Sequence, residues 1–125
     1  MSAWAETELH AVDRADEIGI SSHRNDGTAR PFVTIWAVRV GDEVYVRSAH
    51  GPDNGWFRRA VAAGTGTLQV AGVAGEIRFE TPGPGVHDAI DAAYHAKYDR
   101  YGPGIVGAVV GPTARSATIR LTPAG

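Results

Sequence analysis

The amino-acid sequence predicts a mainly β domain, in which short antiparallel strands form a small closed or partly closed barrel with two or three peripheral α-helices. The 16 glycines and 7 prolines among 125 residues indicate many tight turns. Short segments rich in β-branched and aromatic residues lie between these turns, as in all-β barrels. Hydrophobic residues make up 43% of the chain and charged residues 21%, a balance typical of folded proteins. The length suits one domain, so we expect residues 1–125 to form a single domain.

Six segments have the composition of short strands. In chain order they are 17–23, 32–40, 44–48, 67–73, 76–80 and 117–121. Segment 32–40 is apolar at nearly every position, a pattern typical of a strand that is covered on both faces. We expect turns at 41–43 and at Ala74-Gly75, which would close two hairpins. The register of the first hairpin stays open, because a one-residue shift would turn Tyr45 and Arg47 to the opposite face.

Three segments favour helix. The first is 3–14, where Leu9 and Val12 share one face and Ser2 could be the N-cap. The second is 55–63, with Asp53 or Asn54 as its N-cap. The third and longest is 86–101, which ends before a Gly-Pro pair. Segment 105–110 is either a further strand or a buried turn.

The charge distribution excludes some classes of partner. A net charge of -2 is unlike that of a general nucleic-acid or membrane-surface binder. Residues 23–78 nevertheless carry seven arginines against five acidic residues, so this part of the chain is the one most favourable to an anionic ligand. The sequence has no cysteine, which excludes thiolate metal sites and fits a cytoplasmic location. No apolar stretch is long enough to span a bilayer, and the N-terminus does not resemble a signal peptide.

An anion site is indicated where the second hairpin strand ends. A loop with two glycines leads there into the helix at 55–63, so that loop amides and the helix N-terminus point towards a common spot. Side chains that could add charge-assisted or hydroxyl contacts to a phosphate are Arg47, Ser48, Arg58 and Arg59. Asp53 opposes an anion in the same loop. The alternative is an ordinary capped helix with exposed arginines.

Histidines suggest two further kinds of site. His50 lies in this loop, and an ordinary histidine pKa suits proton transfer, with Tyr45 and Asp53 as further acid–base candidates. His87, Asp91 and His95 share a helix face and could bind a metal, but no fourth ligand is evident, so we expect a solvated face and no metal site.

A polar segment around the Asn-Asp-Gly turn is a further candidate for ligand contact. It contains His23, Arg24, Thr28 and Arg30, which could touch a ligand at the rim of the barrel. The simpler interpretation is the polar end of a hairpin.

Several runs resemble a known class of protein. Residues 22–30, 32–39, 41–42, 44–48 and 54–57 resemble the deazaflavin-dependent nitroreductases, which belong to the flavin-binding split β-barrels related to pyridoxamine phosphate oxidase. Residues 92–98 and 117–123 are instead similar to a small uncharacterised bacterial family of similar barrels, and the chain is identified as a member of that family.

The resemblance implies a six-stranded antiparallel split β-barrel that binds FMN or a deazaflavin. Its phosphate would lie on the loop after the second hairpin strand. The residues expected to line it are Arg47, Ser48, Asn54, Gly55 and Trp56, with Arg58 or Arg59 reaching back. The resemblance further implies a homodimer and an oxidoreductase that acts on a small organic molecule.

Two other functions stay open at this stage. One is a cofactor-free barrel that binds a small molecule, or a biosynthetic enzyme whose acid–base chemistry uses His50, Tyr45 or Asp53. The other is an interaction or stability module without a chemical site. A pocket beside residues 47–58 would speak against the module.

Overall fold

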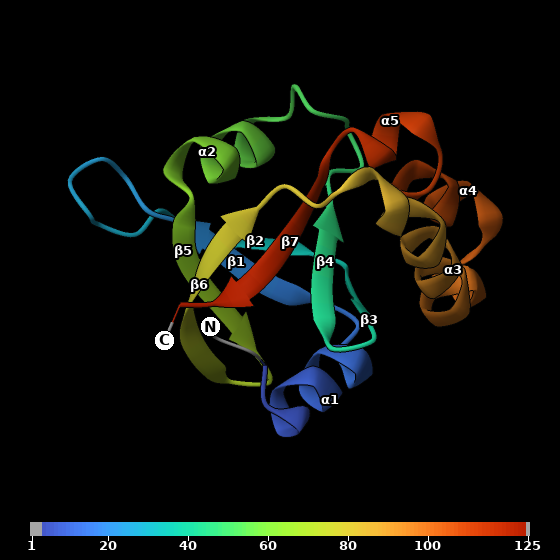
Figure 1. Ribbon diagram of the computed structural model, residues 1–125, viewed down its shortest axis with the longest axis horizontal. Coiled ribbons are helices and arrows are strands. Elements are labelled where there is room, and N and C mark those ends of the chain that lie inside the picture. Colours follow the sequence, from blue (N-terminus) through green and yellow to red (C-terminus); the bar gives the residue numbers. More distant parts are fainter. Residues whose placement is uncertain (1–3, 125) are drawn as a thin grey trace.

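The computed structural model describes residues 4–124, apart from the side chain of Val73. Within this part of the chain, seven strands form a single antiparallel sheet (Figure 1). The strands are β1 (Ile18–Ser22), β2 (Val33–Ile35), β3 (Ala37–Val40), β4 (Glu43–Arg47), β5 (Thr65–Val70), β6 (Val73–Glu80) and β7 (Thr118–Pro123). The order β2-β1-β5-β6-β7-β4-β3 places β2 and β3, which are consecutive in the chain, at the two ends of the sheet. The sheet therefore curls into a nearly closed barrel, as the sequence predicts.

The strand count is seven in place of the expected six, because the segment 32–40 is not one strand. It breaks at Trp36, after which β3 pairs with β4 while β2 pairs with β1. The side chains of the long helix hold the backbone at the break. The Ala37 N–H donates to Oη of Tyr98 at 3.2 Å, and the Ala37 carbonyl accepts from Nζ of Lys97 at 2.7 Å. Backbone groups at the barrel seam thus find partners without a neighbouring strand.

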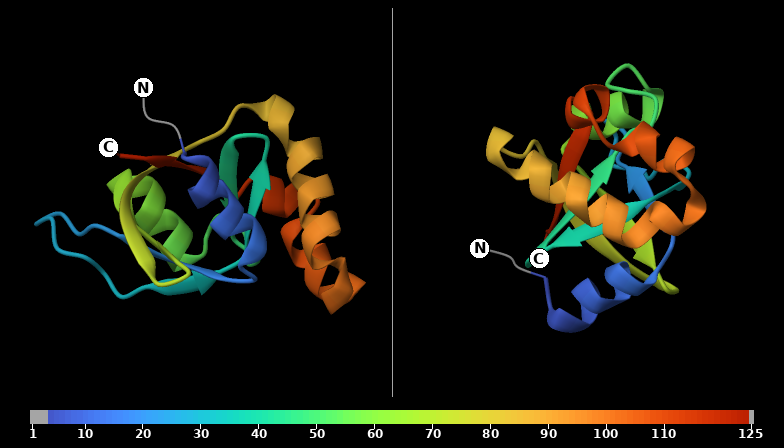
Figure 2. Two further views of the ribbon diagram at one scale, coloured as in Figure 1. Left: turned by 90° about the horizontal axis from the view of Figure 1, so that it is seen from below. Right: turned by 90° about the vertical axis from the view of Figure 1, so that its right-hand side faces the viewer.

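The helices lie around the barrel (Figures 1 and 2). They are α1 (Glu6–Arg14), α2 (Gly55–Ala63), α3 (His87–Tyr98), α4 (Pro103–Val106) and α5 (Pro112–Arg115), with 3₁₀ turns at η1 (Pro84–Val86), η2 (Asp99–Tyr101) and η3 (Gly107–Val109). The three long helices are those that the sequence predicts. Helix α1 begins after Ala5, and the expected N-cap Ser2 lies outside the described residues. Segment 105–110 forms helical turns rather than a strand, with Val106 and Val109 buried.

Local signals set the ends of α2. Oδ1 of Asn54 accepts from the Trp56 N–H at 3.2 Å, which decides between the two expected N-caps. Gly64 ends the helix with φ 71°, a left-handed conformation that glycine adopts without a steric cost.

The turn of the second hairpin is not at Ala74-Gly75, as expected, but three residues earlier. Ala71 and Gly72 have φ values of 53° and 79°, and Gly75 pairs with Leu68 inside the ladder. Both Ala-Gly pairs carry the same local turn signal, and two successive residues with positive φ suit a tight hairpin. Only the pairing of β5 with β6 selects the first of them.

Hydrophobic residues form two cores. The first fills the barrel and includes Val44 and Val46 of β4. The second lies between the outer face of β3 and β4 and helix α3, and it includes Tyr45, Tyr94 and Tyr98. Alternation along β4 therefore turns Tyr45 and Arg47 away from the barrel interior and towards α3, which settles the register that the sequence leaves open. Helix α3 covers this face of the barrel (Figure 2).

Gly66 of β5 occupies a position that has no room for a side chain. A Cβ there would lie 2.2 Å from the Ser21 carbonyl oxygen and 2.8 Å from the Phe79 ring. We expect Gly66→Ala to lower the free energy of unfolding, measured in urea, by about 2–3 kcal/mol. Gly75→Ala is the matched control on the facing strand, since a Cβ there meets no heavy atom within 4 Å. Equal losses of unfolding free energy in Gly66→Ala and Gly75→Ala would contradict this packing.

Candidate functional site

Three adjoining pockets form a groove beside α2, which we call the α2 groove. Their volumes are about 460, 220 and 320 Å³. The first and second share Val33 and Trp56, and the second and third share Arg30 and Arg59, so each pocket adjoins the next. The groove opens beside residues 47–58, which speaks against a module without a pocket.

One end of the groove, the apolar end, has the size and lining of a ligand pocket. Its apolar residues are Val33, Ile35, Trp36, Ala49, Trp56, Ile105, Ala108 and Val109. Its polar residues are Glu17, Thr34, Arg47, His50 and Asn54. Two tryptophans among mostly aliphatic neighbours favour a planar, hydrophobic ligand with a few polar groups.

The other end, the arginine end, is basic. Its pocket is lined by His23, Asn25, Arg30, Gly55, Arg58, Arg59, Ala62 and Ala63. None of these is acidic, and neither is any residue of the 220 Å³ pocket that joins the two ends. Asp53, the expected opponent of an anion, is exposed and lines none of the three pockets. The electrostatic field at this end therefore favours an anionic group.

Two details indicate a cradle at the arginine end. A Cβ on Gly55 would lie 2.8 Å from Nη1 of Arg59, so the glycine lets this guanidinium lie against the first turn of α2. Nε of Arg30 is buried and has no hydrogen-bond partner among the described residues. A buried donor without a partner is costly, and an anionic ligand would supply one.

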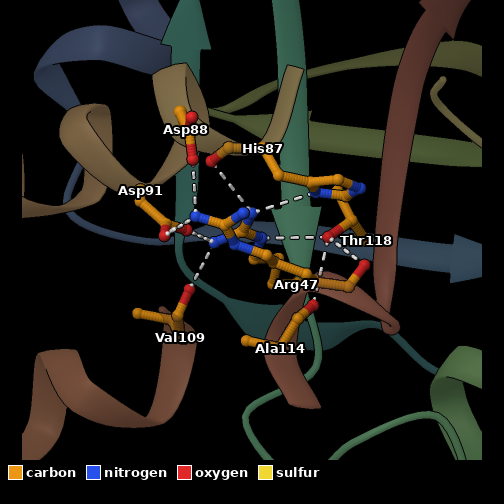
Figure 3. Close-up of polar contacts among 8 residues, drawn as sticks. Arg47, His87, Asp88, Asp91, Val109, Ala114 and Thr118 are labelled. Carbon is orange, nitrogen blue, oxygen red and sulfur yellow. Dashed lines mark hydrogen bonds and ion pairs between the residues drawn. The ribbon is translucent and has the colours of Figure 1, made fainter. Parts of the chain in front are cut away.

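Arg47 lines the apolar end, and its side chain is fully buried. Figure 3 shows its polar contacts. Nε donates to Oγ1 of Thr118 at 2.9 Å, and Nη1 donates to Oδ1 of Asp91 and to the Val109 carbonyl. Nη2 contacts Nδ1 and the carbonyl of His87 at 3.2 and 3.5 Å. All five N–H groups thus have partners within the protein. The guanidinium ties β4 to α3, η3 and β7 and has no N–H left for the expected phosphate contact.

Asp91 is the counter-ion of this cluster. Burial opposes the ionisation of its carboxyl group, but hydrogen bonds from Arg47 and Arg115 outweigh burial and hold the pKa of Asp91 below its usual value. Arg115 also contacts Asp88 at 2.8 Å, at the exposed edge of the cluster. The carboxylate of Asp91 is therefore shared between one buried and one half-exposed arginine.

His87 gives the cluster a pH dependence. Burial, helped by the charges of Arg47 and Arg115, lowers the pKa of His87 from the ordinary 6.5. The unfolded chain then binds more protons around that pH, so stability is complete above about pH 6.5 and declines as the pH falls below it. Urea unfolding from about pH 5 to 8 measures the slope of the unfolding free energy against pH. His87→Gln keeps an acceptor for Arg47 without titrating, and its slope should be shallower. Identical slopes would rule out this role of His87.

The remaining predicted site residues divide into two groups. His50, Asn54 and Trp56 line the apolar end, and Gly55, Arg58 and Arg59 line the arginine end. Tyr45 and Ser48 are buried and line none of the three pockets. Tyr45 packs in the core beneath α3, and Oγ of Ser48 accepts from the His50 N–H at 3.3 Å. The three acid–base candidates His50, Tyr45 and Asp53 thus do not meet at one pocket.

The row of His87, Asp91 and His95 is also divided. His87 and Asp91 contact Arg47, whereas His95 pairs with Asp99 at 2.8 Å one turn further along α3. Residues that the sequence pattern did not single out as site residues are Glu17 and Trp36, which line the apolar end. Arg30 was expected at a polar hairpin end, and the fold brings it to α2. No local signal marks these positions, because each joins the groove only through strand pairing.

A family model described as an uncharacterized protein conserved in bacteria matches residues 8–121 of the chain. The chain belongs to the DUF2255 family. This confirms the bacterial family that the sequence suggested, and no curated protein matches the chain. Among the described residues of this DUF2255 protein, no helix is long and apolar enough to cross a membrane.

Solved structures share the fold of this DUF2255 protein. An F420 reductase has a TM-score of 0.57 and 16% identity over 96% of this chain and 94% of its own. An FAD-binding protein from Mesorhizobium loti has a TM-score of 0.61 and 18% identity over 98% and 92%. A pyridoxamine 5'-phosphate oxidase-related, FMN-binding protein from Nostoc punctiforme has a TM-score of 0.53 and 10% identity over 98% and 80%. The fold is the split barrel that the resemblance implied.

Proposed function

We propose that this protein binds a flavin or deazaflavin in the α2 groove and is an oxidoreductase acting on a small organic molecule. The observation that carries the proposal is the polarity of the groove, in which an apolar end with two tryptophans continues into an end with three arginines and no carboxylate. A flavin-type cofactor has the same division into a planar ring and a phosphate-bearing tail. The split barrels similar to this chain include an F420 reductase and proteins named for FAD and FMN binding.

Each end of the groove has a separate task. Arg30, Arg58 and Arg59 would neutralise the phosphate and hydrogen-bond to it, helped by the partial positive charge at the N-terminus of α2. Trp36 and Trp56 would pack against the ring and exclude water from it. The bound cofactor supplies hydride or electron transfer. His50 is exposed at the rim of the apolar end, where it can exchange a proton with the substrate.

Titration of the purified protein with FMN, FAD and a deazaflavin of the F420 type tests this function. We expect saturable binding of at least one, seen as a change in visible absorption and fluorescence. The bound cofactor should also be reducible and should pass its electrons to an added organic acceptor. Binding of none of the three would overturn the proposal.

We also propose that the protein is a homodimer. Two large apolar side chains that line the groove, Phe32 and Ile105, are 46% and 56% exposed, and a partner subunit would cover them. Light scattering coupled to size-exclusion chromatography measures the mass in solution, and a monomer at all concentrations would refute this assembly.

A further inference from the structure

An aromatic stack connects the apolar end of the α2 groove with the protein surface. Trp36 lines the groove, and its ring stacks on Tyr98 with centroids 4.0 Å apart and planes 4° apart. The ring of Tyr101 lies 5.7 Å from Trp36 and 6.3 Å from Tyr98. Tyr101 is 41% exposed, whereas Tyr98 is fully buried. Three oxidisable rings thus form an unbroken path from the pocket to solvent.

The outer ring of this stack has its own proton acceptor. Oη of Tyr101 donates to Oδ2 of Asp16 at 2.5 Å. This hydrogen bond, together with the nearby Arg100, holds the pKa of Asp16 below its usual value despite some desolvation, so the carboxyl group is ionised at neutral pH. Arg100 also donates to Oη of Tyr101 at 3.1 Å. A tyrosine loses its phenolic proton when it is oxidised, and Asp16 is in place to receive it.

The two buried tyrosines nearby lack such an acceptor. Oη of Tyr98 donates to the carbonyls of Asp16 and Ala37, which cannot take up the proton, and burial raises the pKa of this phenol. Tyr94 lies 5.9 Å from Tyr98, and its hydroxyl group has no hydrogen-bond partner among the described residues. An oxidised state is therefore favoured on Tyr101, with Tyr98 as a bridge that keeps its proton.

We propose that Trp36, Tyr98 and Tyr101 form a one-electron relay that carries oxidising equivalents from the α2 groove to the surface. A one-electron oxidant in the groove takes an electron from Trp36 and is itself reduced by one electron. The Trp36 radical cation then takes an electron from Tyr101, directly or through the Tyr98 ring, and the phenolic proton moves to Asp16. The products are neutral Trp36, a Tyr101 phenoxyl radical and a protonated Asp16.

An oxidised flavin bound in the groove would be such an oxidant when photoexcited, and this part rests on the proposed function. The relay itself depends only on the protein. It would draw a radical away from the pocket, where it could otherwise oxidise the side chains that line it, to a surface tyrosine that solution reductants can repair.

Pulse radiolysis with azide radicals tests the relay in the protein without any cofactor. Azide radicals oxidise tryptophan in preference to tyrosine at neutral pH. We expect the tryptophanyl signal to decay as a tyrosyl signal grows, at a rate independent of protein concentration. Tyr101→Phe and Trp36→Phe should each slow this conversion about tenfold or more. Asp16→Asn keeps an oxygen acceptor at the hydroxyl group but cannot take its proton, and it should also slow the conversion.

Tyr94→Phe is the matched control, since it removes a hydroxyl group that has no hydrogen-bond partner in the described part of the chain and leaves the path intact. In Tyr94→Phe, the rate at which the tryptophanyl radical converts into the tyrosyl radical should match that of the wild type. An unchanged rate in Tyr101→Phe, or a slow conversion in Tyr94→Phe, would overturn the relay. Tyr101 is partly exposed, so its variant stays informative even if Trp36→Phe does not fold.

A second measurement separates the relay from the proposed function. Trp56 also lines the apolar end, so this measurement uses a Trp56→Phe background. With FMN bound, adding Trp36→Phe to this background should lengthen the fluorescence lifetime of the flavin, because the first electron donor of the relay is missing. An unchanged lifetime would refute the link between the groove and the relay. Failure of FMN and the other cofactors to bind would refute the proposed function alone, and the radiolysis result would still decide whether the relay exists.

Discussion

Asp91→Ala is expected to lower the free energy of unfolding by about 3 kcal/mol or more, the cost of leaving a buried charge without its partner. The Arg47 side chain is fully buried, and within residues 4–124 Asp91 is the only carboxylate among its contacts. Without Asp91, the guanidinium keeps neutral hydrogen-bond partners but loses its counter-ion. Urea unfolding at pH 7.5 or so, above the range in which His87 titrates, measures the effect.

Asp88→Ala is the control for this prediction. Asp88 lies on the same helix and contacts the same Arg115, but its side chain is 92% exposed. Its ion pair is screened by water, and we expect its loss to cost less than about 1 kcal/mol. Comparable losses in the two variants would mean that the buried pair with Arg47 contributes nothing beyond an ordinary surface pair.

Arg59→Ala is expected to weaken FMN binding about 10- to 100-fold, as expected for a lost charge-assisted hydrogen bond of about 1.5–3 kcal/mol. The guanidinium of Arg59 lies against Gly55 at the start of α2, in the part of the groove assigned to the phosphate. Riboflavin has the same ring but no phosphate, so its affinity should change by less than about twofold. Isothermal titration of both ligands gives the comparison.

Arg14→Ala serves as the control, because Arg14 lies in α1 and lines none of the pockets of the α2 groove. Arg14→Ala removes the same net charge as Arg59→Ala, so it measures how much of the loss in FMN affinity comes from long-range electrostatics alone. If Arg59→Ala weakens the binding of riboflavin as much as that of FMN, the arginine end does not hold the phosphate. The proposed orientation of the cofactor in the groove would then be wrong.

The part of the site around α2 follows from neighbouring residues. Asn54 caps the helix, Gly55 lets Arg59 fold back, and Gly64 ends the helix with a positive φ. Each of these features acts over a few residues, so it can be inferred from the sequence pattern. For the same reason, Asn54, Gly55, Trp56, Arg58 and Arg59 all line the groove beside α2, although Asn54 and Trp56 line its apolar end and not the arginine end. Their contact with a phosphate stays a prediction.

Arg47 shows where such inference ends. The loop signal placed it beside a phosphate, but pairing of β4 with β3 and β7 turns its side chain outwards beneath α3. A shift of one residue in this pairing would turn it inwards, and no local signal sets that choice. The same limit applies to the turn at Ala71-Gly72, where two identical Ala-Gly pairs compete.

The sequence by itself determined the class of the fold, the positions of the long helices and most of the strands, and the basic loop–helix segment beside α2. These depend on turn residues, caps and hydrophobic periodicity, which act between neighbours in the chain. Only the tertiary structure decided that segment 32–40 breaks at Trp36, that Arg30 and Glu17 join the groove, and that the rings of Trp36, Tyr98 and Tyr101 lie together. These features join residues far apart in the chain, and the free energy that fixes them comes from strand pairing and burial, which exist only once the barrel has closed.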